Sequence, residues 1–293
     1  MNLFHLLAKV SVSAMLIAIV LSFTSCTSLK QQDVVRFVLI ADPQMGFSNP
    51  ANYSSKDLDY FKLTVDKINS LSTPGEFTLI LGDMVHNQSD EQVQWPDYHG
   101  ALASMNIPYH EVMGNHDGWN TKGLVRWRDT WQKQDVYSFN HKGLFFIGLN
   151  SYFLKKPDDL PVETSAQKSF ITSQLKSNAA NPHKFIFQHF PLYRDTPNEE
   201  EQGNRNLPIP ERNFMLEQLE RYQVKAMFSG HSHYEIIRDY KGTLLLAANP
   251  SSRTLGTGKR GFYIVDYKKS TQELSFQFIE NTEAELDDFL MAL

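Results

Sequence analysis

Side chains of the types that bind metal ions follow the ends of several apolar segments in this sequence. Residues 34–40, VVRFVLI, have the β-branched, apolar character of a buried strand, and Asp42 and Gln44 follow them. Ligands in open α/β sheets bind at the carboxyl ends of strands, so we expect side chains in such places to converge. Later apolar segments lead in the same way into the motifs LGD, GNHD, QH and GHSH, which supply Asp83, Asn115, His116, Asp117, His189, His231 and His233.

The ligand types in this set indicate a particular group of metals. Two carboxylates, one or two amide oxygens and three imidazoles suit Zn, Mn or Fe, with Mg as an alternative at one position. The set is large enough for two ions if one carboxylate bridges them. Two ions about 3.5–4 Å apart activate water and hold both ends of an in-line displacement at phosphorus. The residue types therefore fit a binuclear centre for phosphate-ester chemistry.

The elements that must position these residues alternate along the chain. Helical patterns occupy residues 56–71 and 89–105, and Pro96 is expected to break or kink the second of these. Residues 136–151 read as a hairpin with its turn at residues 141–143, and further strands follow toward the C-terminus. Helices and strands that alternate early and hairpins that follow late predict one α/β (α+β) domain over residues 34–293, with two mixed sheets and helices on the outside.

The N-terminal residues predict export and lipid attachment. An uncharged run of 16 residues follows Lys9 and ends before Cys26, which is short for a membrane span but suits a secretory signal. The residues FTSC resemble a bacterial lipobox, so we predict a signal peptide at residues 1–25, lipidation of Cys26 and a polar tether at residues 26–33. The protein would then be an extracytoplasmic, membrane-anchored lipoprotein on the periplasmic face or cell surface. The alternative is a plain signal anchor with an incidental cysteine.

The net charge of the chain bears on its partners. A net charge of −5 argues against a protein that coats nucleic acid, which would be basic, so no nucleic-acid partner is expected. The lipid on Cys26 would instead make a membrane the expected partner.

The order D-x-Q, GD, GNHD, H, GHxH, from Asp42 to His233, resembles the signature of calcineurin-like metallophosphoesterases. The flanking sequences resemble a subgroup that includes a serine/threonine phosphatase, in which glutamine replaces the more common histidine at position 44. The resemblance implies a four-layer αββα sandwich and a phosphoric ester hydrolase with two divalent ions. The identity of those ions (Mn, Fe, Zn or Mg) is left open.

The resemblance also implies a role for each residue. It gives one ion the ligands Asp42, Gln44, Asp83 and His233, and the other ion Asp83, Asn115, His189 and His231. His116 would face the scissile ester and stabilise charge there or protonate the leaving oxygen, with its ring oriented by Asp117. Pro43 is expected to keep Asp42 extended so that Asp42 and Gln44 reach the same ion.

Substrate contacts are predicted from position alone. Arg194 and Arg205 lie in a long polar insertion after His189, and arginine matches phosphate well. Asn150 ends another apolar segment and is expected in the cleft. His86 either helps to orient His116, touches substrate, or is a surface histidine.

Three functions remain open on the sequence. The first is a phosphomonoesterase acting on small phosphate esters or on phosphoserine and phosphothreonine in proteins. The second is a phosphodiesterase acting on nucleotides or lipid head groups, because such folds host both chemistries. The third is a surface-tethered module that binds phosphate esters without turnover.

Overall fold

The computed structural model describes residues 33–48, 56–255 and 258–292. The predicted signal peptide, Cys26 and all of the tether except Asp33 lie outside these residues. In the part of the chain that is described, no helix is both long and apolar enough to cross a membrane. The predicted boundaries at residues 25 and 33 and the lipidation therefore stay predictions.

A five-stranded sheet carries the first metal-ligand motifs. Its order is β11-β10-β1-β2-β3. β1 is parallel to β2 and β2 to β3, so their carboxyl ends share one edge, whereas β10 runs antiparallel to β1. The strands are β1 (Val34–Ile40), β2 (Thr78–Ile80), β3 (Tyr109–Glu111), β10 (Gly261–Lys268) and β11 (Glu273–Glu280).

A six-stranded sheet carries the remaining motifs. Its order is β4-β5-β6-β7-β9-β8, with β5, β6, β7 and β9 parallel and an antiparallel strand at each edge. The predicted hairpin turn is present, since Lys142 and Gly143 join β4 to β5 with φ of 49° and 89°, as a two-residue turn requires. The strands are β4 (Tyr137–His141), β5 (Leu144–Gly148), β6 (Lys184–Phe187), β7 (Ala226–Ser229), β8 (Ile236–Tyr240) and β9 (Thr243–Ala247).

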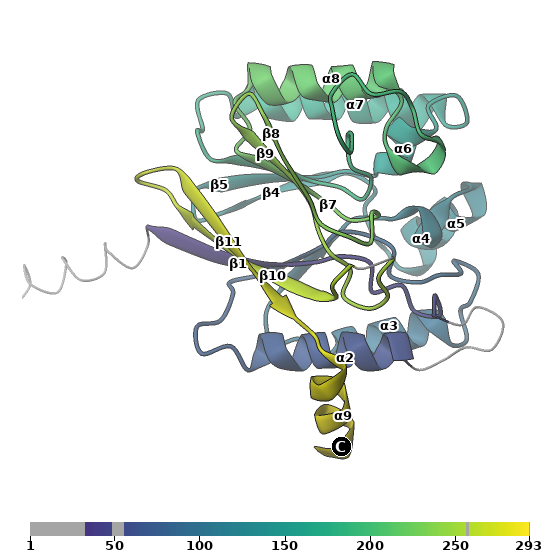
Figure 1. The fold of residues 1–293 in the computed structure, drawn as a ribbon. Coiled ribbons are helices and arrows are strands. Elements are labelled where there is room, and N and C mark those ends of the chain that lie inside the picture. The colour runs from purple at the N-terminus through teal and green to yellow at the C-terminus, as the bar shows by residue number, and fades with distance from the viewer. Residues whose placement is uncertain (1–32, 49–55, 256–257, 293) are drawn as a thin grey trace, which may run out of the picture.

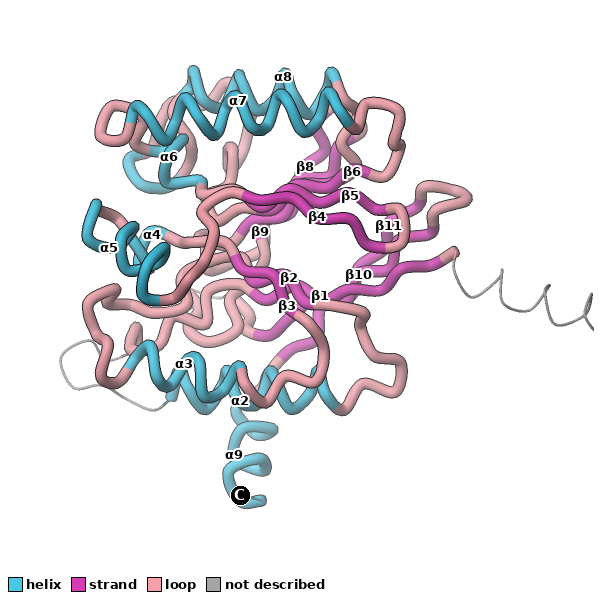
Figure 2. The backbone as a smooth tube through the Cα atoms, turned by 180° about the vertical axis from the view of Figure 1, so that it is seen from behind, coloured by secondary structure: helices cyan, strands magenta, loops and turns pink. Residues whose placement is uncertain are grey.

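Helices cover the outer face of each sheet (Figures 1 and 2). α2 (Lys56–Asn69) and α3 (Gln94–Leu102) lie on the five-stranded sheet, and α7 (Pro161–Ser177) and α8 (Ile209–Arg221) lie on the other. The expected four-layer αββα sandwich is thus confirmed. The short elements are α4 (Asn115–Gly118), α5 (Thr121–Val125), η2 (Arg126–Thr130), α6 (Ser151–Lys155) and η3 (Gly203–Arg205), and α9 (Glu283–Ala292) ends the described chain.

Pro96 does not kink its helix. α3 begins at Gln94, which places Pro96 in the first helical turn. Backbone N–H groups of the first turn have no partner within a helix, so the missing N–H of proline costs nothing there. The helical pattern before Gln94 instead forms a turn-rich segment.

Phenylalanine rings fill the space between the two sheets. Phe37 and Phe77 of the five-stranded sheet region stack with centroids 5.3 Å apart, and Phe146 and Phe185 of the other sheet stack at 4.9 Å. Phe37 meets Phe146 edge to face across the layer at 5.6 Å. All four rings are fully buried or nearly so. This packing fixes the separation of the sheets, and with it the positions of the loops at their carboxyl edges.

Candidate metal centre

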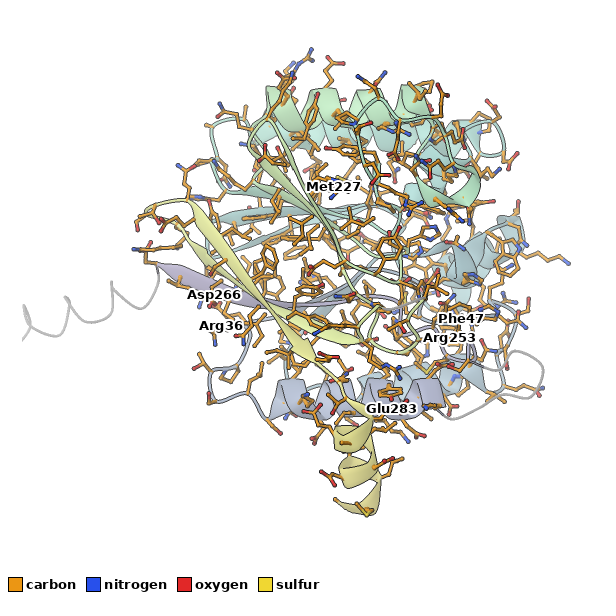
Figure 3. All side chains as sticks on the ribbon, in the orientation of Figure 1. Arg36, Phe47, Met227, Arg253, Asp266 and Glu283 are labelled. Atoms are coloured by element: carbon orange, nitrogen blue, oxygen red, sulfur yellow. The ribbon has the colours of Figure 1, made fainter. Side chains whose placement is uncertain are left out.

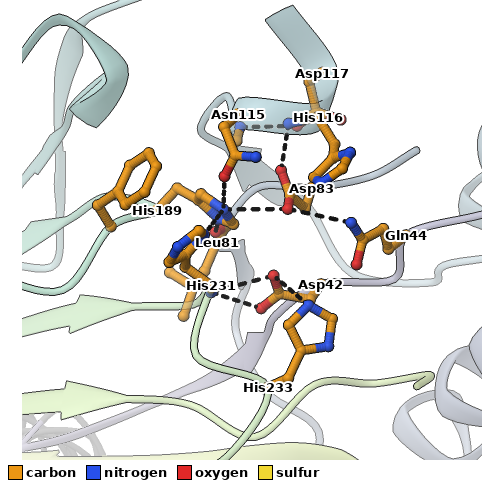
Figure 4. A network of polar contacts seen from close by, with 12 residues as sticks. Asp42, Gln44, Leu81, Asp83, Asn115, His116, Asp117, His189, His231 and His233 are labelled. Carbon is orange, nitrogen blue, oxygen red and sulfur yellow. Dashed lines mark hydrogen bonds and ion pairs between the residues drawn. The ribbon is translucent and has the colours of Figure 1, made fainter. Parts of the chain in front are cut away.

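The carboxyl ends of strands from both sheets meet at one edge of the sandwich (Figures 1 and 4). The five-stranded sheet supplies one half of the site and the six-stranded sheet the other. Every metal-ligand residue predicted from the sequence lies within this one cluster, joined to the others by contacts of 3.6 Å or less. Asp42 follows β1, Asp83 follows β2, Asn115 begins α4 after β3, His189 follows β6, and His231 and His233 follow β7.

The backbone at five of these residues is strained. Their φ angles are positive, between 37° and 70°, a region that costs non-glycine residues about 1–3 kcal/mol each. The expectation that Pro43 keeps Asp42 extended is wrong: φ of Asp42 is 48°, and its amide donates to the Gly82 carbonyl at 3.2 Å. Bonds to the neighbouring strand end therefore override the bias from proline. The five residues are Asp42, Gln44, Asp83, His231 and His233.

Two imidazole nitrogens face each other in the first part of the site. Nε2 of His189 lies 3.1 Å from Nδ1 of His231. The other nitrogen of each ring is already bonded to a carbonyl, of Leu81 at 2.8 Å for His189 and of Asn204 at 2.5 Å for His231. A carbonyl oxygen only accepts, so those outer nitrogens carry the protons. When both rings are neutral, the two facing nitrogens are therefore left with lone pairs directed at each other.

Two oxygen ligands complete this group (Figure 4). Nε2 of His189 is 3.2 Å from Oδ1 of Asn115 and 3.3 Å from Oδ2 of Asp83. One ligand atom each from Asp83, His189 and His231 lie within 4.8 Å of one another. Lone pairs and oxygens this close repel each other unless a positive charge lies among them. The donor set therefore fits a cation.

The pKa values of the site residues also indicate that positive charge stabilises this group of ligand atoms. Burial lowers the pKa of His189, but the negative charge of Asp83 and a hydrogen bond to it raise that pKa to about 9. Burial and the charge of His189 lower the pKa of His231 to about 3. Burial raises the pKa of Asp83, yet the charges of His189 and His116 hold it well below its usual range. A proton on His189 satisfies the charge balance, and a divalent ion would replace it while binding all four ligand atoms.

A second group of ligand atoms lies on the other side of Asp83. Nδ1 of His233 is 2.6 Å from the Arg253 carbonyl, which leaves its Nε2 lone pair 3.6 Å from Oδ1 of Asp42. Oε1 of Gln44 is buried and has no hydrogen-bond partner among the described residues, while its Nε2 is 3.4 Å from Oδ2 of Asp83. An unpartnered buried amide oxygen is costly, and a cation would satisfy it. Asp83 lies between both groups, as a bridging carboxylate must.

His116 is held from behind by the segment after Asp83. Its Nδ1 is 2.8 Å from the His86 carbonyl, and its ring stacks on the His86 ring with centroids 4.6 Å apart. Its backbone N–H donates to Oδ1 of Asp83 at 2.8 Å. The remaining nitrogen, Nε2, is left for the cavity that the ring lines.

Asp117 does not orient the His116 ring, contrary to expectation. Its carboxylate accepts hydrogen bonds from the backbone N–H groups of Met84 and Gly114, both at 2.8 Å, and of Val85 at 3.2 Å. Asp117 lies in the first turn of α4, where a side chain turns back toward free backbone N–H groups. Burial and the nearby Asp83 charge raise its pKa to about 7. Asp117 thus holds the two backbone segments that carry Asp83 and His116.

His86 belongs to a stack of rings beside the site. The Phe47 ring stacks on His86 at 5.1 Å and contacts the His233 ring edge to face at 5.0 Å. The Arg253 guanidinium lies over the Phe47 ring, 4.7 Å from its centroid (Figure 3). Of the interpretations open for His86, the contact with His116 is therefore the one that the structure supports.

A cavity of about 420 Å³ opens over the two ligand groups. Arg194 and Arg205 line it, together with Gln44, Asp83, Asn115, His116, His231 and His233. Arg194 is held by Gln202 at 3.1 Å and lies over the Tyr234 ring, whereas Arg205 is exposed.

Asn150 is not in this cavity. It is fully buried, and its Oδ1 caps α6 by accepting from the backbone N–H of Tyr152 at 3.1 Å. The strand end that suggested a role in the cleft is instead a helix start. Its expected contact with substrate is therefore a wrong prediction.

The sequence did not reveal the backbone groups that orient the imidazoles. The carbonyls of Leu81, Asn204 and Arg253 each fix one histidine of the site. Every residue has a backbone carbonyl, so the residue type does not indicate which carbonyl contacts an imidazole ring, and only the fold shows it. Phe47 was also missed, although an aromatic residue so close to Gln44 was the one available signal.

Comparison with known proteins indicates the same protein family as the sequence motifs. The family model described as calcineurin-like phosphoesterase matches residues 35–235. Serine/threonine-protein phosphatase CPPED1 from Homo sapiens is 27% identical over 248 residues, which cover 78% of this chain and 79% of the relative.

Two solved structures share the fold at low sequence identity. A dimetal phosphatase from Danio rerio aligns with a TM-score of 0.57 and 15% identity, covering 79% of this chain and 92% of that one. A purple acid phosphatase from yellow lupin seeds aligns with a TM-score of 0.58 and 15% identity, covering 86% and 55% of the two chains.

Proposed function

This chain belongs to the calcineurin-like phosphoesterase family and is a phosphoric ester hydrolase, and we propose that within this family it is a phosphomonoesterase with a binuclear metal centre. One observation carries the metal centre in this proposal: Nε2 of His189 and Nδ1 of His231 face each other 3.1 Å apart beside two oxygen ligands. This arrangement is costly in a hydrolase without cations and favourable in one that binds them.

We assign the ligands in two groups that share Asp83. One ion would be held by Asp83, Asn115, His189 and His231, and the other by Asp42, Gln44, Asp83 and His233. Mn, Fe, Zn and Mg all remain candidates for these positions. When bound, such ions neutralise phosphate oxygens and make hydroxide available near neutral pH.

The protein's own groups supply the rest of the chemistry. His116 is fixed through Nδ1 by the His86 carbonyl, so its Nε2 can deliver a proton to the leaving oxygen. Arg205 on the rim of the cavity can pair with the phosphate of an incoming substrate. Arg194, already held by Gln202, would add positive charge to the same side.

The relatives and the predicted location bear on the substrate class. The CPPED1 relatives are named as serine/threonine-protein phosphatases, which supports phosphoserine or phosphothreonine in proteins as substrates. Extracytoplasmic attachment through Cys26, which we propose from the sequence, would favour small phosphate esters instead. Both substrates are phosphomonoesters, so the reaction proposed is the same.

A substrate panel tests the reaction type. The chain loaded with Mn²⁺ should hydrolyse p-nitrophenyl phosphate and a phosphoserine peptide, lose that activity with EDTA, and act weakly on bis-p-nitrophenyl phosphate. A preference for the bis-ester would make it a phosphodiesterase. Metal-independent binding of phosphate esters without any hydrolysis would leave only the binding module.

A further inference from the structure

Two buried cations lie outside the metal centre and contact the same loop. Lys155, the last residue of α6, is 3% exposed, and Arg212 on α8 is fully buried. A buried charge is costly unless hydrogen bonds satisfy it, so the partners of these two side chains indicate what they hold in place. Those partners belong to residues 194–207, the polar insertion that follows β6.

Lys155 holds the distal part of this insertion. Its ammonium group donates to Oε1 of Glu201 at 2.6 Å, to the Gly203 carbonyl at 2.5 Å and to the Asn206 carbonyl at 2.8 Å. Three donors are thereby matched by three acceptors. Two of the acceptors are backbone carbonyls on either side of Asn204, so the lysine sets the path of the main chain there.

Arg212 holds the two ends of the insertion. Its guanidinium donates to the carbonyls of Pro197 at 3.0 Å and Glu199 at 2.6 Å, and to the Leu207 carbonyl at 2.8 Å. Within the loop, Glu199 accepts from Nδ2 of Asn206 at 2.5 Å. Charge-assisted hydrogen bonds from the two cations therefore reach the loop from Pro197 to Leu207.

This loop contacts the metal centre through Asn204. The Asn204 carbonyl lies 2.5 Å from Nε2 of His231, the contact that leaves Nδ1 of His231 facing His189. The next residue, Arg205, lines the cavity, and no hydrogen bond ties its guanidinium within the described part of the chain. Partners of this kind set the tautomer and orientation of a metal-binding histidine.

We propose that Lys155 and Arg212 are positioning residues that fix residues 194–207, so that Asn204 orients His231 toward the metal and Arg205 is presented to the substrate. The proposal rests on the proposed function, because it assigns His231 to a metal. It makes the loop both a support for the metal centre and a determinant of substrate affinity. Neither role requires the two cations to touch the metal or the substrate.

Lys155→Met is the main test, because methionine keeps the volume and removes the charge. After chelator treatment and removal of the chelator, the variant should bind Mn²⁺ about 10–100-fold more weakly than the wild type in calorimetry, the range found when a partner of a metal-binding residue is lost. Hydrogen exchange of the amides of residues 194–207 should become faster. KM for p-nitrophenyl phosphate should rise.

Two variants separate positioning from other effects. Lys168→Met is the matched control, because Lys168 on α7 pairs with Glu211 on α8 at 2.9 Å and does not contact the loop. The Mn²⁺ affinity and the KM of this variant should match those of the wild type. Arg205→Gln should raise KM while leaving Mn²⁺ affinity unchanged.

A variant that loosens the loop from within covers the case in which Lys155→Met does not fold. Glu199→Ala removes the acceptor for Asn206 and for the backbone N–H groups of Arg194 and Asp195. It leaves every hydrogen bond of Lys155 and Arg212 in place, because Arg212 bonds the backbone carbonyl of Glu199. It should show the same loss of metal affinity and the same faster exchange.

The outcomes distinguish this proposal from the one on which it rests. A wild type that binds no divalent ions and hydrolyses nothing would contradict the proposed function. A wild type that binds and hydrolyses, with a folded Lys155→Met or Glu199→Ala variant of unchanged metal affinity and KM, would contradict the positioning role alone.

Discussion

His116 lies in the metal centre but belongs to neither of the two groups of ligand atoms. Its Nδ1 is bonded to the His86 carbonyl and its ring stacks on His86, so the ring is held in one orientation beside the bridging Asp83. A residue fixed in this way and left with one nitrogen toward the cavity suits proton transfer to a leaving group.

His116→Asn should therefore lower kcat strongly and leave the metal content almost unchanged. General acid–base catalysis contributes about 10²–10⁴-fold, and the loss in kcat should fall in that range. Steady-state kinetics and elemental analysis of the same sample measure both quantities. Loss of the ions in this variant would instead make His116 a ligand.

Gln44 distinguishes the two metal positions. An amide oxygen is a harder and generally weaker ligand for Zn than imidazole, so the position that includes Gln44 should bind Mn or Mg in preference to Zn. Gln44→His should increase the affinity of that position for Zn, measured by competition with a chromophoric chelator. Identical affinities and metal preferences in the two proteins would show that Gln44 does not bind the metal.

At the scale of elements, the junction of β3 with α4 leaves no space beside Asp83. A Cβ added at Gly114 would overlap both the carboxylate and the backbone nitrogen of Asp83. The close approach of these two segments brings the backbone N–H of His116 to Asp83, so glycine at this position is a requirement of the site.

Gly114→Ala should displace Asp83, lower the free energy of unfolding by about 1–3 kcal/mol and abolish metal binding. Gly100→Ala on α3 is the matched control, because a Cβ there meets nothing within 4 Å. That control should be about 0.5–1 kcal/mol more stable than the wild type by chemical denaturation, since alanine favours a helix. Full metal binding by Gly114→Ala would contradict the proposed packing at Asp83.

An ion-pair cluster joins the two sheets at the end of the β4–β5 hairpin. Glu76, which precedes β2, is 2.5 Å from Nε2 of His141 and 2.7 Å from Nζ of Lys142. Burial raises the pKa of Glu76, but the hydrogen bonds from Lys142 and His141 outweigh it and lower that pKa below 4.5. A carboxylate with a lowered pKa stabilises the fold above its unfolded pKa, and this contribution is lost as the pH falls through the folded pKa.

Glu76→Gln should therefore be less stable than the wild type at pH 7, by less than about 1 kcal/mol because the pair is partly exposed. The difference should shrink as the pH falls below about 4.5. Urea denaturation of both metal-free proteins at pH 7 and pH 3 measures it. A difference that stayed constant with pH would assign the effect to packing instead of charge.

At the scale of the molecule, the metal centre lies where the two sheets meet. Asp42, Asp83 and Asn115 come from the five-stranded sheet, and His189 and His231 from the six-stranded one. Neither sheet carries a complete ligand set. The aromatic layer between the sheets, which includes Phe37 and Phe146, therefore also sets the distances between ligands.

This convergence could be predicted because the ends of strands and the types of the residues that follow them can both be recognised in the sequence. The carboxylate of Asp83 or the imidazole of His189 after an apolar segment is a local signal, and parallel strands bring such ends together. The support for these ligands could not be predicted. Asp117 binds the backbone N–H of Met84 and Asn204 contributes a carbonyl to His231, both through tertiary contacts that no local sequence pattern indicates. Asn150 caps a helix through a local contact, but in the sequence the start of that helix resembles the end of a strand.

The central claim is that two cations lie in one site and share Asp83. Anomalous diffraction from crystals of the protein grown with Mn²⁺ tests it most directly. We predict two peaks, one among Asp83, Asn115, His189 and His231 and the other among Asp42, Gln44, Asp83 and His233. Crystals with Mn²⁺ in excess that showed no peak at these residues, or peaks only elsewhere, would contradict the claim.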